Sequence, residues 1–596
     1  MTHERRVTQS DVVAMKRASI AMKRALAFVF VATVVARGAR AEYGHDASNF
    51  QGKHFCGMSI SLSSPSSVRD VSEVVYGRER VKANGAGHSW HRGLFCSAGE
   101  GESGVNVDSR GVRSATSTGE RFWIDDGGMV VRVDAGVITR DLLDALARRG
   151  YTLPAFPWFI DQTIGGACAT ASHGSSLKAG SLSSQLVALT MVHADGKVKH
   201  YDEGSTPAPL FNALRANLGR LGVVVDVTLR IVPNTLVTRR SQDLSPDDFV
   251  RQMQRVSDIV RACEKSSKYN NVDEVWKCAM NYDEIKALDE TQLFWYIPLK
   301  ELTRVTFERS SPMPTFASYN EMSLSPEMSA IHFGTLTAPI DSLIKSQPRT
   351  APRDLTAAVT LMGSEALAPS WAQQWRRATA ENISPEIDEQ SDSFLTMSEV
   401  QYQMHERFGY EQLEVGIPLR NAGQCMKAFS DALYGEESLF GGFRSQALLR
   451  FIKPESAWLA PTNGRAGTLY VNIEDFVKYS RVVDRMANRK FQAAVDVLRG
   501  SVCEGRLHWG KFGFPKAGCF DGAKEYGVAF CHFGCQVRAL DPSGKFRSDS
   551  DTLTFSGIDL HRCCGADGLF KENGASCKCA LNDRASASEC SSWSED

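Results

Sequence analysis

The chain of 596 residues is long enough for two to four folded domains, at about 150 residues each. Hydrophobic residues make up 43% and charged residues 23% of the sequence, proportions that exclude a disordered, collagen-like or coiled-coil protein. The 68 Lys and Arg residues nearly balance the 69 Asp and Glu residues. Because no basic excess is present to neutralise phosphates, we expect no nucleic-acid partner.

The N-terminus has the pattern of a secretory signal. Basic residues precede the apolar run 26–36, and the small residues Ala39 and Ala41 follow it, so we expect cleavage after Ala41 and assign 1–41 to a targeting segment. The run is shorter than the about 20 residues that span a bilayer. We therefore expect an extracellular or secretory-pathway protein with no transmembrane span in the mature chain. An uncleaved membrane anchor or the first part of a leader to an organelle lumen is the alternative.

The first half of the chain alternates strands with helices. Apolar and polar residues alternate over 129–135, which predicts a half-buried strand, and the apolar stripe that follows predicts a helix from Thr139 to just before Gly150. The apolar stretch 185–193 and the Asp-Gly turn after it predict a β-hairpin. We therefore predict an α+β domain rich in antiparallel strand pairs for 42–235.

The pattern changes after Pro233 to longer segments with fewer glycines, and we place a second α+β domain at 236–546. A helix is predicted where Phe491, Ala494, Val495 and Leu498 recur at helical spacing. The last segment, 547–596, has few apolar residues, so it requires cross-links to fold.

Cysteines are concentrated at the C-terminus. Nine of the 15 lie in the last 94 residues, which predicts a disulfide-bonded tail formed in an oxidising compartment. The odd total leaves at least one thiol free or paired between chains. Zinc is the alternative, but the spacings do not form paired C-x2-C ligand sets, so we favour disulfides and expect no metal site. The nine are Cys503, Cys519, Cys531, Cys535, Cys563, Cys564, Cys577, Cys579 and Cys590.

Two segments carry residues suited to binding a cofactor. In 84–91, Asn-Gly-Ala-Gly-His-Ser-Trp-His, two glycines allow close backbone approach, and the neutral imidazole of His88 could act as a nucleophile. In 163–176, small residues at almost every position would expose successive backbone N–H groups to a pyrophosphate. The stretch lacks a P-loop lysine and the acidic residue of a Rossmann unit, which points to another nucleotide fold. Taken separately, a Gly-x-Gly pair is more often a tight turn than a cofactor loop, and a close-packed loop is an equally good interpretation of the second segment.

Four segments in this order resemble the sugar-lactone and alditol oxidases, FAD-linked oxidoreductases whose FAD domain is of the vanillyl-alcohol oxidase (p-cresol methylhydroxylase) type. They are 85–89, 164–174, 218–223 and 508–511. The resemblance covers roughly 56–546, and the secretory N-terminus, Cys56, Cys96 and the Cys-rich tail look most like plant-type L-gulonolactone oxidases. It implies a two-part FAD-binding domain, an α+β substrate (cap) domain that returns to the flavin at its end, and the tail.

The resemblance also implies a covalent flavin. His88 matches the family histidine that is bonded to the 8α-methyl carbon of the isoalloxazine ring, and His91 is a competitor outside the motif. The other residues that match cofactor-binding positions are Gly85, Ala86, Gly87, Ser89, Trp90, Gly165, Gly166, Ala169, Ser172, His173, Ser175 and Val223.

The residues expected at the reaction centre are spread over the second domain. Lys511 matches a lysine that reaches flavin and substrate, and an ammonium there would stabilise developing negative charge. Arg450 matches the arginine of a Glu-x-Arg segment, but Leu448 stands where many members have Glu. Glu414 matches a family acidic position, and His508 opens the motif of Lys511. Standing alone, a Trp-Gly-Lys stretch is more often a surface turn, and a strand-edge Glu is more often solvated.

The implied reaction is oxidation of an aldonolactone such as L-gulono-1,4-lactone or D-arabinono-1,4-lactone. Hydride would pass to flavin N5, and O2 would then reoxidise the flavin and be reduced to H2O2. The oxidised lactone would rearrange to ascorbate or an analogue. Two alternatives stay open. One is an oxidase or dehydrogenase of alditols or sugars, and the other is a catalytically idle secreted flavoprotein.

Overall fold

The computed structural model describes residues 49–50, 56, 59–98, 102–114, 119–266, 271–312, 410–436, 443, 446–476, 481–511, 520–547, 553–555, 557–574 and 576–580. All of them belong to one compact unit, formed by 46–323 and 347–596. A second unit, 1–45 with 324–346, lies outside the described residues, and so does the predicted targeting segment 1–41. None of the described helices is both long and apolar enough to span a bilayer.

The chain first forms a small parallel sheet in the order β1-β3-β2. Ser67 caps the helix between β1 and β2 and forms a capping box with Asp70, which fixes where that helix begins. The strand β2 leads directly into the first predicted motif, the segment 84–91. The elements are β1 (Ile60–Ser63), α2 (Val68–Gly77), β2 (Val81–Asn84) and β3 (Gly104–Asp108).

An antiparallel sheet of five strands follows, in the order β4-β5-β9-β7-β8. It confirms the strand predicted over 129–135 and the hairpin predicted after 185–193, in which Val192 pairs with Val198. The predicted helix begins at Thr139, and the chain turns at Gly150 with a φ of +79°. The elements are β4 (Phe122–Asp125), β5 (Val130–Asp134), α4 (Thr139–Ala147), β7 (Leu186–Val192), β8 (Val198–Asp202), α7 (Ala208–Arg215) and β9 (Val223–Arg230).

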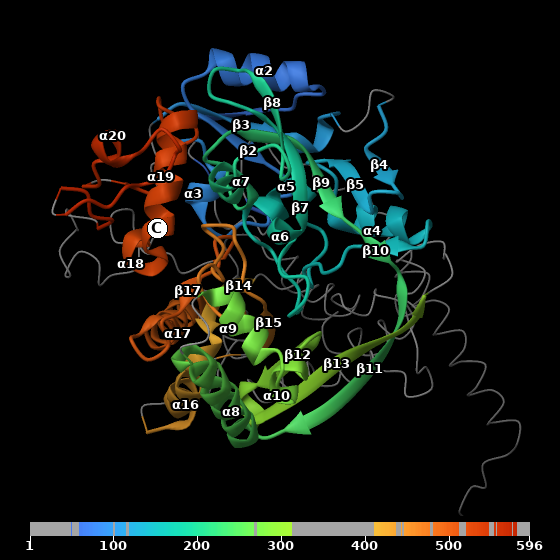
Figure 1. The fold of residues 1–596 in the computed structure, drawn as a ribbon, viewed down its shortest axis with the longest axis vertical. Helices are drawn as coiled ribbons and strands as arrows, with labels where there is room; N and C mark the ends of the chain where they lie inside the picture. The colour runs from blue at the N-terminus through green and yellow to red at the C-terminus, as the bar shows by residue number, and fades with distance from the viewer. Residues whose placement is uncertain are drawn as a thin grey trace, which may run out of the picture. The chain divides into compact units, whose positions relative to one another are not determined.

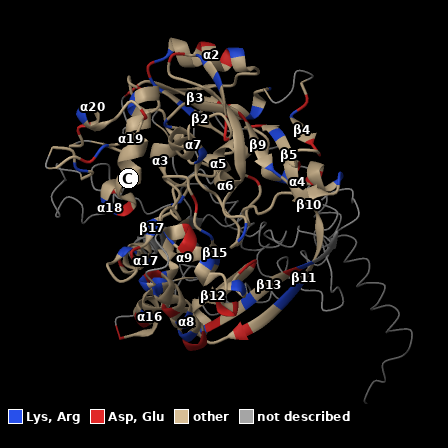
Figure 2. Ribbon diagram, in the orientation of Figure 1, with Lys and Arg blue, Asp and Glu red and all other residues tan. Residues whose placement is uncertain are grey.

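The middle of the chain forms an antiparallel sheet in the order β11-β13-β12-β15-β16-β14-β17. Its first strand begins at Thr235, so the change of sheet lies just after Pro233. Both acidic and basic residues lie on β11 and β13 (Figure 2). The strands are β11 (Thr235–Leu244), β12 (Thr291–Tyr296), β13 (Glu301–Pro312), β14 (Tyr410–Pro418), β15 (Ala447–Ile452), β16 (Thr468–Phe476) and β17 (Arg506–Leu507).

Helices cover one face of this sheet, and α8 and α16 lie side by side (Figure 1). Their apolar side chains share one core with alternate strand residues such as Leu413, Leu449 and Val471. The helix predicted from Phe491 to Leu498 is confirmed as part of α17. The helices are α8 (Pro246–Lys265), α9 (Val272–Ala279), α16 (Leu419–Tyr434) and α17 (Arg481–Arg499).

The described part of the tail packs onto the first domain. Leu553 and Phe570 share a core with Leu214 of α7 and with Phe530 of α19 (Val528–Leu540). The predicted disulfides are confirmed among the described cysteines, and three of them join the tail to α19 or close it on itself. The pairs are Cys56–Cys96, Cys263–Cys278, Cys425–Cys503, Cys531–Cys579, Cys535–Cys564 and Cys563–Cys577.

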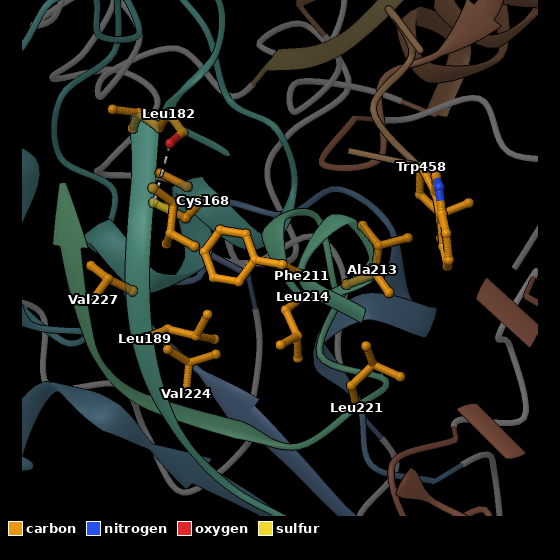
Figure 3. Packing of buried hydrophobic residues seen from close by; sticks show 14 of the residues in the cluster. Cys168, Leu182, Leu189, Phe211, Ala213, Leu214, Leu221, Val224, Val227 and Trp458 are labelled. Atoms are coloured by element: carbon orange, nitrogen blue, oxygen red, sulfur yellow. Dashed lines mark hydrogen bonds between the residues drawn. The ribbon is translucent and has the colours of Figure 1, made fainter. Parts of the chain in front are cut away.

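One described cysteine keeps a free thiol, as the odd total predicts. Cys168 is buried in the core of the first domain, beside Leu182 and near Phe211 (Figure 3). Burial raises the pKa of this thiol to about 12, so it stays protonated and unreactive. Cys519 and Cys590 lie outside the described residues.

Candidate active site

The four sequence motifs meet at one cavity. Its wall consists of the loop after β2, the segment around α5 (Ile164–Ala169), the turn before β9, and the turn after β17. Nine of the residues predicted to bind the cofactor line it, as do two predicted for the reaction. They are Gly85, Ala86, Gly87, His88, Ser89, Gly165, Gly166, Ala169, Ser172, His508 and Lys511.

Glycines at two contact points let these segments pack without filling the cavity. A Cβ at Gly85 would lie 2.0 Å from Thr163 Oγ1, and one at Gly165 would lie 2.7 Å from the Cβ of Ala135. Gly87 has a φ of +77°, a conformation that side chains other than glycine rarely adopt. At these glycines the loops pack closely because no side chain separates them. A narrow cavity remains between the loops.

Several backbone N–H groups after Thr163 are used within the fold, so they are not open to a ligand, and binding of a pyrophosphate by 163–176 stays a prediction. The N–H of Ile164 donates to Val137 O and that of Gly165 to Ala135 O, each at 2.8 Å. The N–H of Ala167 donates to Thr163 O within the first turn of α5. The start of α5 docks onto the end of a neighbouring strand, and this contact uses the donors that the sequence pattern left available.

His88 lines the cavity between two aromatic rings. The ring of Phe50 stacks on the imidazole with centroids 4.2 Å apart, and Phe159 lies 4.7 Å away. The pKa of His88 is lowered to about 4, mainly by desolvation and with help from the charge of Lys511, while the charge and backbone carbonyl of Asp161 oppose the shift. The imidazole is therefore neutral near pH 7. Because one nitrogen donates to the Asp161 carbonyl, the other keeps its lone pair.

Lys511 also lines the cavity. A turn places it, in which the N–H of Lys511 donates to His508 O and the N–H of His508 donates to Glu414 O at 2.8 Å. Its ammonium group donates to Gln412 Oε1 on β14. Desolvation lowers the pKa of Lys511 to about 8, although Glu414 opposes the shift. Lys511 is thus mostly charged at pH 7 and titrates just above it.

A buried ion pair lies behind Lys511. Arg450 donates from Nη2 to Glu414 Oε1 and from Nη1 to the carbonyl of His173 at 2.9 Å. Burial alone would raise the pKa of Glu414, but the charge of Arg450, with help from the neighbouring groups, outweighs it and holds the pKa below its usual range. Desolvation lowers the pKa of His173 well below its usual value and that of His508 to about 4. Both imidazoles are therefore neutral, and the lasting charges are those of Glu414, Arg450 and Lys511.

The same cluster brings together possible metal ligands that the sequence did not predict. Ligand atoms of His173, Glu414 and His508 lie within 4.8 Å of one another. The carboxylate of Glu414 is already paired with the guanidinium of Arg450. His508 Nδ1 accepts from the N–H of Gly510 at 3.1 Å, and its ring also donates to a backbone carbonyl. A cation would have to displace these partners, so the donor set favours the ion pair over a metal.

Sequence profiles of two families match the chain, and together they cover more than half of it. One is described as an FAD binding domain and matches residues 60–202, and the other is described as D-arabinono-1,4-lactone oxidase and matches 342–552. The chain is therefore similar to an FAD binding domain in its first part and to the sugar-lactone oxidases in its later part. Its cofactor is FAD.

Individual relatives match over shorter stretches. L-gulono-1,4-lactone dehydrogenase of Mycobacterium tuberculosis is 31% identical over 36% of this chain and 46% of its own length. L-gulonolactone oxidase of Mus musculus is 31% identical over 34% of this chain and 43% of its own. D-arabinono-1,4-lactone oxidase of Saccharomyces cerevisiae is 30% identical over 32% and 35%. The chain thus matches less than half the length of these curated relatives.

A solved cholesterol oxidase from B. sterolicum has the same fold. It superposes with a TM-score of 0.58 over 86% of this chain and 97% of its own, at 13% identity. A solvent-stable cholesterol oxidase gives a TM-score of 0.55 at 16% identity, over 85% of this chain and 97% of its own. At such identities the likeness concerns the fold alone.

The residues of the cavity fit FAD. Its wall is built mainly from Gly, Ala, Ser and Thr, which leave room for a planar ring and a long chain between close-packed loops. Asn84 Oδ1 is buried at this wall without a hydrogen-bond partner among the described residues, so an acceptor is available to a ligand. His88 adds a neutral imidazole with a free lone pair. These features agree with the cofactor that the family requires.

Four predicted cofactor-binding residues do not line the cavity. The N–H of Trp90 donates to Gly510 O at 3.0 Å and so ties the first motif to the fourth. Ser175 joins the two domains, because its hydroxyl donates to Thr291 O and accepts from the N–H of Phe451. Val223 packs in an apolar core, and His173 stands against the ion pair. Their contact with FAD stays a prediction.

Sequence reasoning missed several residues of the site. Gln162, Thr163 and Asn217 line the cavity, and Gln412 bonds Lys511. A signal for Gln412 was present, since it precedes Glu414 by two residues and a strand places such residues on one face. Phe50 gave no signal, because its stacking on His88 joins residues from separate loops.

Proposed function

We propose that this protein oxidises a hydroxyl group of an aldonolactone such as L-gulono-1,4-lactone, with FAD as the immediate electron acceptor and O2 as the final one. The observation that carries the proposal is the convergence of four separate motifs on one cavity that is lined by both His88 and Lys511. The lactone oxidase and dehydrogenase relatives support the substrate class. Formation of an ascorbate-type product is part of the same proposal.

FAD, when bound, supplies the acceptor for the two electrons of the alcohol. The chain contributes fixed charge and shape around it. The ammonium of Lys511 would lie where negative charge develops on an oxygen, and in a site with little water its effect on the transition state is large. Glu414 is held ionised by Arg450, so it is a weak base, and its proposed role is to orient the guanidinium. His508 uses its ring nitrogens on backbone groups, and it would hold the turn that presents Lys511.

His88 is proposed to bind the flavin covalently. A neutral imidazole with one nitrogen engaged by a carbonyl has the nucleophilic lone pair that such a bond needs. The test is acid precipitation of the purified protein followed by mapping of fluorescent peptides. Flavin should stay on the peptide that contains His88, and His88→Ala should release it. His91→Ala is the matched control from the same loop and should keep it. Release of flavin from the unchanged protein, or retention in His88→Ala, would disprove the linkage.

The substrate class is tested by anaerobic reduction of the bound flavin. A panel of aldonolactones, alditols and free sugars is mixed with the yellow protein, and the visible absorbance is followed. Rapid bleaching by a lactone is expected. Bleaching by alditols alone would favour an alditol oxidase or dehydrogenase instead. A protein that no polyol bleaches would be catalytically idle.

The final acceptor is tested separately, because one relative is named a dehydrogenase. Peroxide formed in air is compared with the reduction of an artificial electron acceptor under nitrogen. Stoichiometric peroxide is expected.

We also propose that the protein matures in the secretory pathway. Disulfides join twelve of the described cysteines, and such pairs persist in oxidising compartments. Expression with the native N-terminus and sequencing of the mature protein should give a new terminus after Ala41.

A further inference from the structure

The face of the large sheet opposite the helices is buried and carries a patterned set of polar groups. Leu413, Leu449 and Val471 belong to the core beneath the helices, so their neighbours along each strand point to the opposite face. That face carries Glu414 on β14 and Arg450 on β15. Both belong to the site described above.

The strand register arranges this face in rows. In one row, Phe294 of β12 pairs with Leu448 of β15, Leu448 with Asn472 of β16, and Asn472 with Glu414 of β14. The row is apolar at one end and charged at the other. Asn472 is therefore the residue at which the apolar half changes to the polar half.

Asn472 presents a buried acceptor without a partner. The residue is 1% exposed, and its Nδ2 donates to Glu474 Oε1 at 3.2 Å. Because a carboxylate only accepts, this contact fixes which end of the amide is the donor. Asn472 Oδ1 has no hydrogen-bond partner among the described residues.

A buried donor without a partner lies diagonally across the sheet from this acceptor. Arg450 pairs with Tyr470 in the register, two residues from Asn472, and such diagonal neighbours are within reach of long side chains. Two nitrogens of Arg450 are bound to protein, but its Nε has no partner in the described part of the chain, and the residue is 5% exposed. Buried polar groups are nearly always satisfied, so an unpaired donor beside an unpaired acceptor points to a ligand.

A chain of hydrogen bonds connects Asn472 to the cavity. Lys511, at the cavity wall, donates to Gln412, which donates in turn to the same Glu474 carboxylate that Asn472 contacts. The acceptor of Asn472 thus belongs to the polar network that ends at Lys511.

We propose that Asn472 determines specificity by accepting a hydrogen bond from a substrate hydroxyl, whose oxygen accepts in turn from Arg450 Nε. This inference rests on the proposed function and names its recognition group. A hydroxyl is both donor and acceptor, which matches the pair of unpaired groups. On the other side of Asn472, Leu448 and Phe294 offer no polar partner. The substrate class is therefore a compact polyhydroxylated lactone with one recognised hydroxyl at this boundary, rather than an extended alditol.

The test combines a truncation with a set of deoxy substrates. Wild type, Asn472→Ala and Asn472→Leu are compared on L-gulono-1,4-lactone and on analogues that each lack one hydroxyl. Asn472→Leu keeps the volume and removes the acceptor. Asn421→Ala, a buried asparagine on α16 at the covered face, is the matched control. Flavin content and thermal unfolding are recorded for each protein.

In wild type, removal of one particular hydroxyl should lower kcat/KM roughly 10-fold, the equivalent of one neutral hydrogen bond. Both Asn472 variants should lose about the same factor on the full substrate and should no longer discriminate against that analogue. A merely structural role would lower activity on all substrates equally.

Two failures are distinguishable. Variants that discriminate among the analogues as wild type does, or that lower every activity by one factor, overturn the inference alone. If wild type oxidises no lactone, the proposed function fails and the inference fails with it.

Discussion

The titration of Lys511 makes the proposed chemistry measurable. Desolvation lowers the pKa of this ammonium to about 8, whereas an exposed lysine titrates above 10. The protonated form is the one that stabilises negative charge, so activity should be present below this pKa and fall as the pH rises through it. The pKa values of His88 and His508 are about 4, so neither should titrate between pH 5 and 7.

The size of the effect follows from the fraction protonated. With a pKa of about 8, Lys511 is about 90% charged at pH 7 and about 10% charged at pH 9, so kcat/KM should fall roughly 10-fold over this interval. Removal of the charge by Lys511→Met should cost roughly 100- to 1000-fold at pH 7, the usual effect of losing one group that stabilises a developing anion.

The assay is a pH profile of kcat/KM for the lactone that wild type oxidises best. Lys511→Arg is the decisive variant, because a guanidinium does not deprotonate in proteins. Its activity will be lower, since the head group is larger, but the alkaline fall should disappear. Lys524→Arg, an exposed lysine on α18 (Gly522–Tyr526), should leave the profile unchanged. A wild-type profile that is flat to pH 10, or a fall that persists in Lys511→Arg, would refute the reasoning.

Two further predictions concern stability. Glu414→Gln leaves the buried guanidinium of Arg450 without its counter-charge and should lower the free energy of unfolding by about 3–5 kcal/mol. The measurement is urea unfolding, with Glu436→Gln at an exposed position as the control. An equal unfolding midpoint for both variants would contradict the buried pair. Replacing Cys535 and Cys564 together by Ser removes a cross-link between residues 29 apart and should cost about 3.5 kcal/mol, and an unchanged thermal midpoint would show that the tail is held by packing alone.

The sequence predicts the local elements well because they depend on near neighbours. Period-two alternation located β5, a continuous apolar stretch located β7, and the apolar stripe located α4 within two or three residues of its ends. The first glycine motif of the cavity was found for the same reason, since the positive φ of Gly87 is required by the loop itself. The parallel sheet of β1, β2 and β3 gave no comparable signal, because its strands have only four or five residues.

Contacts made by distant segments were harder to predict. The N–H groups at the start of α5 looked available to a ligand, but the docking of α5 beside Ala135 uses them. Phe50 precedes His88 by 38 residues in a region without pattern, and its role appears only from the stacked rings. In both cases the contacting residue belongs to another element of the fold, so the local sequence does not predict the contact.

The missing carboxylate at position 448 shows why strand order matters. In the sequence of β15, Leu448 stands two residues before Arg450, at the position where many family members have Glu. The sequence alone therefore predicts a site that lacks an acidic group. The register places Glu414 in the same row, two strands away across Asn472, so its distance from position 448 is about 10 Å at the usual strand spacing. Arg450 reaches toward this second position and pairs with Glu414 there. The counter-charge of the guanidinium therefore comes from β14, and position 448 is apolar. Because strands β14 and β15 are joined through β16, which follows both in the sequence, only the folded sheet reveals this pairing.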